Sequence, residues 1–181
     1  MRLGKLKKVI KTEKRATIYL TDTVEADERA NPYLRWVCAG RGYYAAENEL
    51  HLNEDVLRSA LEFTDAERRD IEIDTGDAAE AELMLHTIPG VIDQYALKDR
   101  RDLRMEAGMV FHLVELEDDS WAMLDETLVL PCYRPGAKTN FVSAPHGVAI
   151  YADGLLVGVV QPIEVTDNVR DFLRKIAGGL R

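Results

Sequence analysis

Short apolar runs that meet at glycine turns recur at both ends of the chain and constrain its fold most strongly. Glycine takes positive φ at no steric cost, so two such runs joined by a short glycine turn predict a β-hairpin. Hairpin strands are antiparallel, so a chain built from them is expected to form a largely antiparallel sheet. The two clearest pairs are Tyr33–Ala39 with Tyr43–Ala46, around 40–42, and Val148–Tyr151 with Leu155–Val160, around Asp153 and Gly154.

Helix signals stand between and after these strands. Asn53 is placed to cap a helix, and Thr64 with Glu67 has the spacing of a capping box. We therefore predict an α+β fold: a mostly antiparallel sheet, two to four helices, and a C-terminal amphipathic helix packed on the sheet. The residues expected to face the sheet from that last helix are Val169, Phe172, Leu173 and Ile176. Further strands are expected at 16–21, 71–74, 109–116, 121–124, 128–130 and 141–144, with 78–86 ambiguous and a helix at 91–97.

The two hairpins are each followed by a polar cap and a helical pattern. Val56, Ala60 and Phe63 correspond to Val169, Leu173 and Ile176 at a constant offset of 113 residues. This order indicates either a duplicated unit or two independent uses of one motif.

Length and composition favour a single domain without a membrane span. The chain of 181 residues is long enough to bury a core without disulfides or metals, and we expect one globular domain over 16–181, or two lobes that divide near 90–108. No apolar stretch approaches the roughly 20 residues that a membrane span needs. Cys38 and Cys132 lie in separate apolar runs, which is typical of reduced, buried thiols, although a disulfide or a nucleophile stays open. A cytoplasmic location is expected.

Charge is strongly segregated along the sequence. Residues 1–15 hold seven basic side chains and one acid, whereas residues 47–82 hold thirteen acids and three arginines, and the whole chain is at −9. Residues 115–126 add six acids and no base. The N-terminal segment is interpreted either as a frayed end or lysine-protected edge strand, or as a phosphate-binding element. The acids are interpreted either as solvated faces or as a dock for a basic protein.

These patterns nominate two sets of binding residues. For a protein partner of basic character, the candidates are the carboxylates that open the acidic segment. For nucleic acid, the candidates are the lysines of the N-terminal segment. The partner-binding set is Glu47, Glu49, Glu54, Asp55, Asp65 and Glu67, and the nucleic-acid set is Lys5, Lys7, Lys8, Lys11 and Lys14.

No catalytic motif, cofactor motif or metal-ligand spacing accompanies these charges. His112 is expected in a strand and His146 in a loop, and neither has a second histidine at ligand spacing. The acid pairs 118–119 and 125–126 lack a calcium-loop frame, so a solvated hairpin tip is the better interpretation. We therefore predict no cofactor and no catalytic or metal residues, while a small hydrolase or metal-dependent enzyme using His112 or His146 stays an alternative.

Two runs carry a local resemblance. The segment 153–163 resembles the last strand of bacterial sliding clamps, in which an apolar strand runs into a proline and an aliphatic residue. The segment 50–57 resembles a clamp helix with its flanks. In size and acidity the chain is also similar to accessory proteins of phages and mobile elements. The resemblance implies a replication or transcription accessory but carries over no functional residue.

The prediction for function is a non-enzymatic, acidic binding or regulatory protein of phage or mobile-element type that acts by protein–protein interaction. The first alternative is a nucleic-acid-associated accessory, and the second is the small enzyme. No membrane partner is expected, and the sequence does not decide the oligomeric state.

Overall fold

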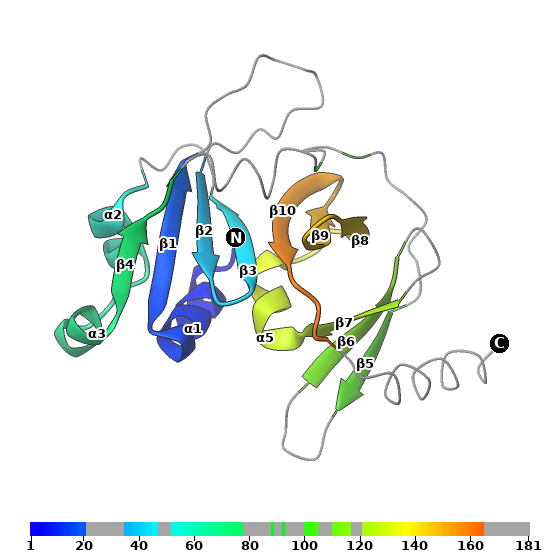
Figure 1. Cartoon of the computed structure of the whole chain (residues 1–181), viewed down its shortest axis with the longest axis horizontal. Coiled ribbons are helices and arrows are strands. Elements are labelled where there is room, and N and C mark those ends of the chain that lie inside the picture. Colours follow the sequence, from blue (N-terminus) through cyan, green and yellow to red (C-terminus); the bar gives the residue numbers. More distant parts are fainter. Residues whose placement is uncertain are drawn as a thin grey trace.

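The computed structural model describes residues 1–20, 35–46, 52–77, 88, 92, 100–104, 110–116 and 121–164. The fold is α+β, as predicted, with helices and two sheets around a shared core (Figure 1). The helices are α1 (Leu3–Glu13), α2 (Glu54–Ala60), α3 (Asp65–Asp70) and α5 (Glu126–Val129), followed by the 3-10 turn η1 (Leu130–Cys132). The strands are β1 (Arg15–Leu20), β2 (Arg35–Ala39), β3 (Gly42–Ala46), β4 (Glu72–Thr75), β5 (Arg100–Arg104), β6 (Val110–Glu115), β7 (Trp121–Asp125), β8 (Thr139–Ala144), β9 (Gly147–Ala152) and β10 (Leu155–Val160).

The main sheet has seven strands in the order β4-β1-β2-β3-β10-β9-β8. The expectation of a mostly antiparallel sheet is right only in part, because the sheet is mixed: β4 pairs parallel to β1, with Arg15 opposite Glu72 and Ile18 opposite Thr75. A parallel neighbour needs a long crossover, and here the chain from β1 to β4 passes through β2, β3, α2 and α3.

The two predicted hairpins are confirmed and lie next to each other in this sheet. β2 pairs with β3 and β9 pairs with β10, both antiparallel, and β3 pairs antiparallel with β10. Each hairpin is extended outward by the strand before it, β1 in one case and β8 in the other. The sheet therefore contains two three-stranded meanders, β1-β2-β3 and β8-β9-β10, which are joined through β3 and β10. This arrangement is compatible both with a duplicated unit and with two independent uses of one motif.

Both faces of the central strands of the main sheet contribute to buried clusters, which explains why these strands are apolar on both sides. On β2, Val37 belongs to the core cluster that includes α1, and Trp36 belongs to a second cluster on the other face. β3 is buried at every residue. Trp36 and Val37 therefore lie on opposite faces of the sheet.

The basic N-terminal segment is an α-helix, so both the frayed end and the edge strand are wrong. Leu6, Val9 and Ile10 repeat at i, i+3 and i+4, and all three are buried in the main core. The helix ends at Lys14, which adopts a left-handed conformation with φ 57°. The amide of Arg2 also donates to the Pro131 carbonyl at 2.8 Å, which fastens the helix to η1.

The second sheet has the order β5-β6-β7 and is followed directly by α5. The strand expected at 128–130 is wrong, since these residues lie in α5 and η1. Asp125 accepts a hydrogen bond from the Thr127 amide and so caps this helical turn. The sequence does not predict β5, because this strand consists mostly of charged residues. The expected elements at 78–86 and 91–97, and the C-terminal helix with its packing on the sheet, lie outside the described residues.

Candidate functional site

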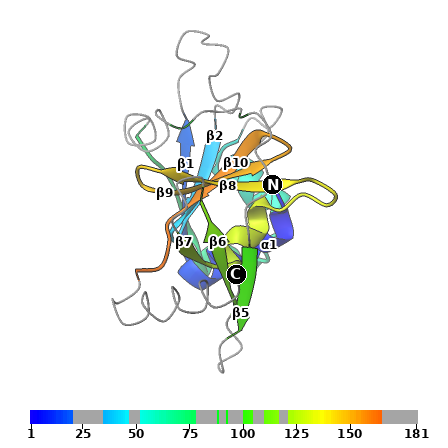
Figure 2. The same cartoon turned by 90° about the vertical axis from the view of Figure 1, so that its right-hand side faces the viewer.

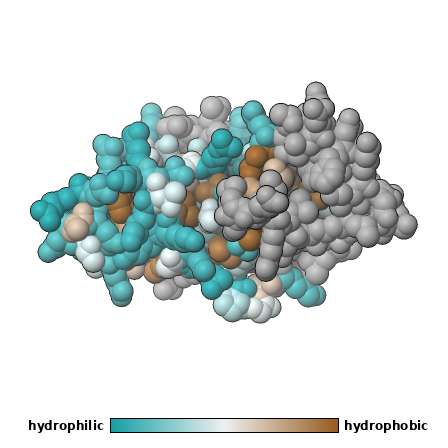
Figure 3. All heavy atoms as spheres, turned by 90° about the horizontal axis from the view of Figure 1, so that it is seen from below, coloured by the Kyte–Doolittle hydropathy of each residue, from teal (hydrophilic) through white to brown (hydrophobic). Residues whose placement is uncertain are grey.

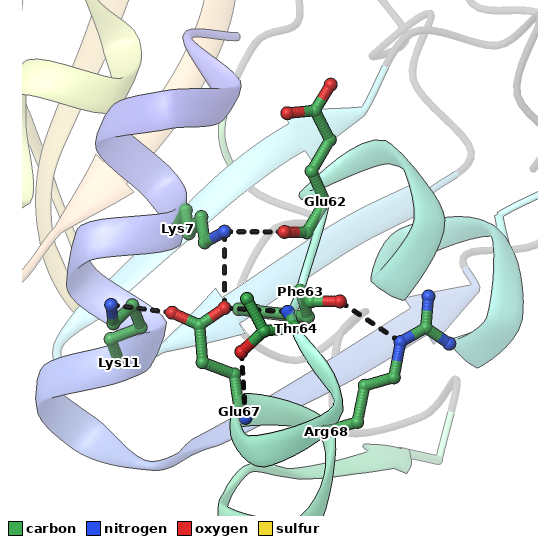
Figure 4. A network of polar contacts seen from close by, with 7 residues as sticks. All are labelled: Lys7, Lys11, Glu62, Phe63, Thr64, Glu67 and Arg68. Carbon is green, nitrogen blue, oxygen red and sulfur yellow. Dashed lines mark hydrogen bonds and ion pairs between the residues drawn. The ribbon is translucent and has the colours of Figure 1, made fainter.

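The lysines of α1 lie against the acidic segment. Side chains that the sequence nominates for nucleic acid and for a protein partner therefore contact one another. Glu67 sits at the third position of α3 and faces α1 (Figure 4). Its carboxylate is 2.6 Å from Lys11 Nζ and 3.3 Å from Lys7 Nζ. Lys7 also donates to the Glu62 carbonyl at 2.7 Å and lies over the Phe63 ring. Two nominated lysines and one nominated acid therefore bind one another.

Glu67 also completes the capping box that the sequence predicts. Its carboxylate accepts from the Thr64 amide at 2.9 Å, and its own amide donates to the Thr64 hydroxyl at 3.3 Å. The Lys11 ammonium, the Thr64 amide and Lys7 favour the charged carboxylate and lower the pKa of Glu67 to about 2. The side chain thus joins α1 to the start of α3.

Two further ion pairs continue this contact, one between the ends of α1 and α3 and one between the parallel strands β1 and β4. Lys14 Nζ lies 2.9 Å from an Asp70 carboxylate oxygen. Arg15 donates from Nε at 3.1 Å and from a terminal nitrogen at 2.8 Å to the same Asp74 oxygen. Hydrogen bonding to Asp74, followed by the attraction of Asp74 and Glu72, raises the pKa of Arg15 above its usual value.

The opposite charges of the two segments balance. Residues 1–20 and 52–77 together contain ten basic and ten acidic side chains. The underside of this part of the molecule is correspondingly hydrophilic (Figure 3). Over all described residues the sequence has seventeen basic and sixteen acidic side chains, so the net negative charge belongs to the other residues. The surface formed by residues 1–20 and 52–77 is therefore neither uniformly acidic nor uniformly basic.

The other nominated partner-binding acids do not gather into one site. Glu54 pairs with Arg58 one helical turn later at 2.7 Å. Asp55 and Asp65 occupy the first turns of α2 and α3, where they complement the helix dipole. Glu47 and Glu49 lie outside the described residues. Of the nominated lysines, only Lys5 and Lys8 have no ion pair within the described part of the chain.

An open groove crosses the sheet where β4, β1 and β2 lie side by side. Its volume is about 730 Å³. Arg15, Thr17 and Tyr19 line it from β1, and Cys38 lines it from β2. These residues alternate with Ala16 and Ile18, which are packed in the core with α1, so the groove lies mainly on the opposite face. The full lining is Glu13, Arg15, Ala16, Thr17, Tyr19, Cys38, Ala39, Gly40, Asp74, Thr75 and Gly76.

Two glycines shape this groove. Gly40 has φ +57°, and a Cβ there would come within 2.9 Å of Glu13 Oε1. A Cβ at Gly76 would collide with the Tyr19 ring. The absence of side chains at both positions leaves room for Glu13 and Tyr19 to lie along the groove.

The residues of the enzyme alternative lie in different environments. His112 is buried, with its ring 6.0 Å from that of Tyr133 and its Nε2 4.0 Å from Glu126. His146 is exposed in the turn between β8 and β9. Cys132 is buried in the main core, and burial raises the pKa of its thiol to about 12, so it is protonated at neutral pH. Cys38 and Cys132 are not joined in a disulfide.

Within the described residues, no group of three or more histidines, cysteines and acids is placed to hold a metal ion. Among the helices of that same part, none is both long and apolar enough to cross a membrane. The chain matches no protein-family model, no curated protein and no solved structure.

The sequence does not predict the groove because its lining comes from segments that are distant along the chain. Arg15 belongs to the basic segment, Asp74 to the acidic segment, and Cys38 to an apolar run. The available signal was the two alternating polar positions Arg15 and Thr17 on a β-branched strand. The strand β4 also lines the groove. Its position cannot be inferred from the sequence, because it depends on the parallel pairing with β1.

Proposed function

We propose that the chain is a non-enzymatic binding protein that acts through protein–protein interaction, and that a partner segment occupies the groove of β4, β1 and β2. The observation that carries the proposal is the groove itself. It is open and has room for a few residues of a partner, and it offers carboxylates, a guanidinium, hydroxyls and an aromatic ring. This mixture of polar groups around an aromatic side chain is common in protein interfaces that form and dissociate.

Charge favours a partner segment with a basic side chain. Arg15 already neutralises Asp74 through two hydrogen bonds. Glu13 has no cation within ion-pair distance in the described part of the chain, and its carboxylate lies beside Gly40. A lysine or arginine of the partner would therefore find Glu13 as its counter-ion. The proposed binding site for a basic partner is therefore this groove and not the whole acidic segment 47–82.

Capture from a lysate of the source cells tests the proposal when it is made with matched variants. Thr17→Arg places bulk and positive charge in the groove, and Glu13→Gln removes the carboxylate without adding bulk. Asp65→Asn is the control, because it removes one negative charge from exposed α3 outside the groove. All variants are first compared by circular dichroism.

The proposal predicts that wild type and Asp65→Asn retain the same protein at low salt, and that Thr17→Arg and Glu13→Gln lose it. Retention should also fall at high salt, because the pairing is partly electrostatic. Equal retention by all four proteins would contradict the groove as the site. Retention of no protein by wild type at low salt would contradict the binding function.

The second candidate is association with nucleic acid. It is favoured by Lys5 and Lys8, which remain on α1 without carboxylate partners in the described part of the chain. Removing residues 1–15 is not a usable test, since it also removes part of the core. Lys5→Glu with Lys8→Glu should abolish a gel shift of duplex DNA if these lysines bind phosphate. An unchanged shift would end this interpretation.

A further inference from the structure

The strand β4 ends the main sheet, and its outer side carries backbone groups that β1 does not use. The Glu72 amide donates to the Lys14 carbonyl at the start of β1 at 3.0 Å, so β4 residues of this parity bond to β1. The amides and carbonyls of Ile73 and Thr75 therefore point to the other side. In the described part of the chain, β1 is the only strand that pairs with β4. Figure 1 shows β4 as the outermost strand at this end, and Figure 2 shows the sheet from the opposite end, which β8 forms.

The groove face of β4 is acidic. In the register of β4 and β1, Glu72 lies opposite Arg15. Asp74 lies opposite Thr17, so both acids share the face of the groove. Arg15 holds Asp74 through one carboxylate oxygen, whereas Glu72 is exposed and makes no ion pair with any described residue. Together with Glu13, the groove lining and this face of β4 hold three carboxylates and one guanidinium, a balance of −2 that favours a cationic partner.

We propose that the partner segment continues from the groove along the outer side of β4 as an additional strand, with lysine or arginine at alternate positions beside Glu72 and Asp74. This binding mode rests on the proposed function, because it specifies how the segment in the groove is held. Main-chain hydrogen bonds to Ile73 and Thr75 supply affinity, and alternate side chains supply specificity. Every second side chain of an added strand falls on the groove face, and opposite charges on neighbouring strands are favourable pairs.

The same acids disfavour a second copy of this chain as the added strand. In a two-fold pairing centred on Ile73, Glu72 of one copy would lie opposite Asp74 of the other. In a pairing centred on Asp74, that residue would lie opposite its own copy. Like charges directly opposite each other destabilise a strand pair, and charged residues commonly protect an edge strand in this way. A basic segment reverses the sign of these contacts, so an edge that rejects its own copy accepts a cationic strand.

Amide proton shifts of the isotope-labelled full chain test the added strand directly. The probe is a synthetic peptide in which lysine and valine alternate, with both of its ends blocked. Its binding should move the proton resonances of the Ile73 and Thr75 amides downfield, because both amides gain a hydrogen bond. Two forms of the peptide, N-methylated on every valine or on every lysine, are matched controls. Only one of these alternate sets of amides faces β4, so one form should lose binding and the other should keep it.

Variants of the edge give an independent measurement with the same peptide. Thr75→Pro removes one outward amide and leaves the hydrogen bonds to β1, and proline is tolerated where the amide of an edge strand faces solvent. It should raise the dissociation constant at least about fivefold, because one main-chain hydrogen bond is lost. Thr75→Ala keeps the amide and is the control, with an expected change of less than about twofold. Both variants are first compared with wild type by circular dichroism.

Three results would overturn the added strand. They are unchanged Ile73 and Thr75 amides in the presence of the peptide, equal binding of the two N-methylated forms, and equal binding by Thr75→Pro and Thr75→Ala. Capture from the lysate separates this failure from failure of the proposed function. If Glu13→Gln loses the partner and Thr75→Pro retains it, the groove function stands without the added strand, whereas retention by both variants contradicts the groove as well.

Discussion

Replacing Leu6 with alanine tests whether the basic segment belongs to the folded core. Leu6 is fully buried beside Val9 and Ile10, on the face of α1 that packs against the main sheet and η1. A Leu→Ala change at such a site removes buried methyl groups and leaves a cavity, which costs about 2–5 kcal/mol. For a chain of this size each kcal/mol lowers the melting temperature by roughly 2–4 °C, so a fall of about 4–20 °C is expected.

Lys8→Ala is the matched control two residues away. Lys8 is exposed and makes no ion pair within the described part of the chain, and lysine and alanine are both good helix formers. Its free energy of unfolding should stay within about 0.5 kcal/mol of wild type. Urea unfolding followed by circular dichroism measures both variants. Equal stability of Leu6→Ala and Lys8→Ala would show that α1 is not part of the core. The ion pairs between α1 and the acidic segment would then have no structural basis.

Three further predictions concern contacts that the fold depends on. Tyr44→Phe should lower the free energy of unfolding by about 1–2 kcal/mol in urea, because the buried hydroxyl that donates to the Leu128 carbonyl is lost; an unchanged midpoint would contradict this. Gly158→Ala should destabilise by about 1–3 kcal/mol, since its Cβ would collide with Cys132 Sγ, and Cys132→Ala in the same chain should recover part of that loss. Glu67, with its pKa lowered to about 2, stabilises the folded state above about pH 4.5, and this contribution is lost as the pH falls toward 2. Glu67→Gln should therefore be less stable than wild type at neutral pH and approach it in acid, and parallel pH profiles would refute the assignment.

Local turn and capping chemistry made much of the fold predictable. The hairpins around Gly40 and Gly154, the Asn53 cap and the Thr64 capping box each depend on a few neighbouring residues, and each is present. The prediction of a strand at 128–130 is wrong because Leu128 and Val129 are equally compatible with a buried strand and with a buried helical turn. The decisive signal was Asp125, whose side chain caps α5.

The remaining features depend on contacts distant in sequence. α1 was missed because its lysines dominate the composition, while its apolar side is only as wide as Leu6, Val9 and Ile10. The groove was missed because it forms only when residues 59 positions apart, Arg15 and Asp74, meet on parallel strands. Segregated charges in the sequence thus became internal ion pairs, which composition alone cannot distinguish from a binding surface.

Alkylation of Cys38 measures occupation of the groove most directly. The half-buried Cys38 thiol lines the groove, whereas Cys132 is buried and serves as an internal control. The rate of N-ethylmaleimide addition is followed by mass spectrometry in the protein alone and in the complex with the partner that wild type retains. The account predicts that the partner slows the reaction of Cys38 and that Cys132 reacts slowly in both states. An equal rate for Cys38 with and without the partner would contradict binding in the groove.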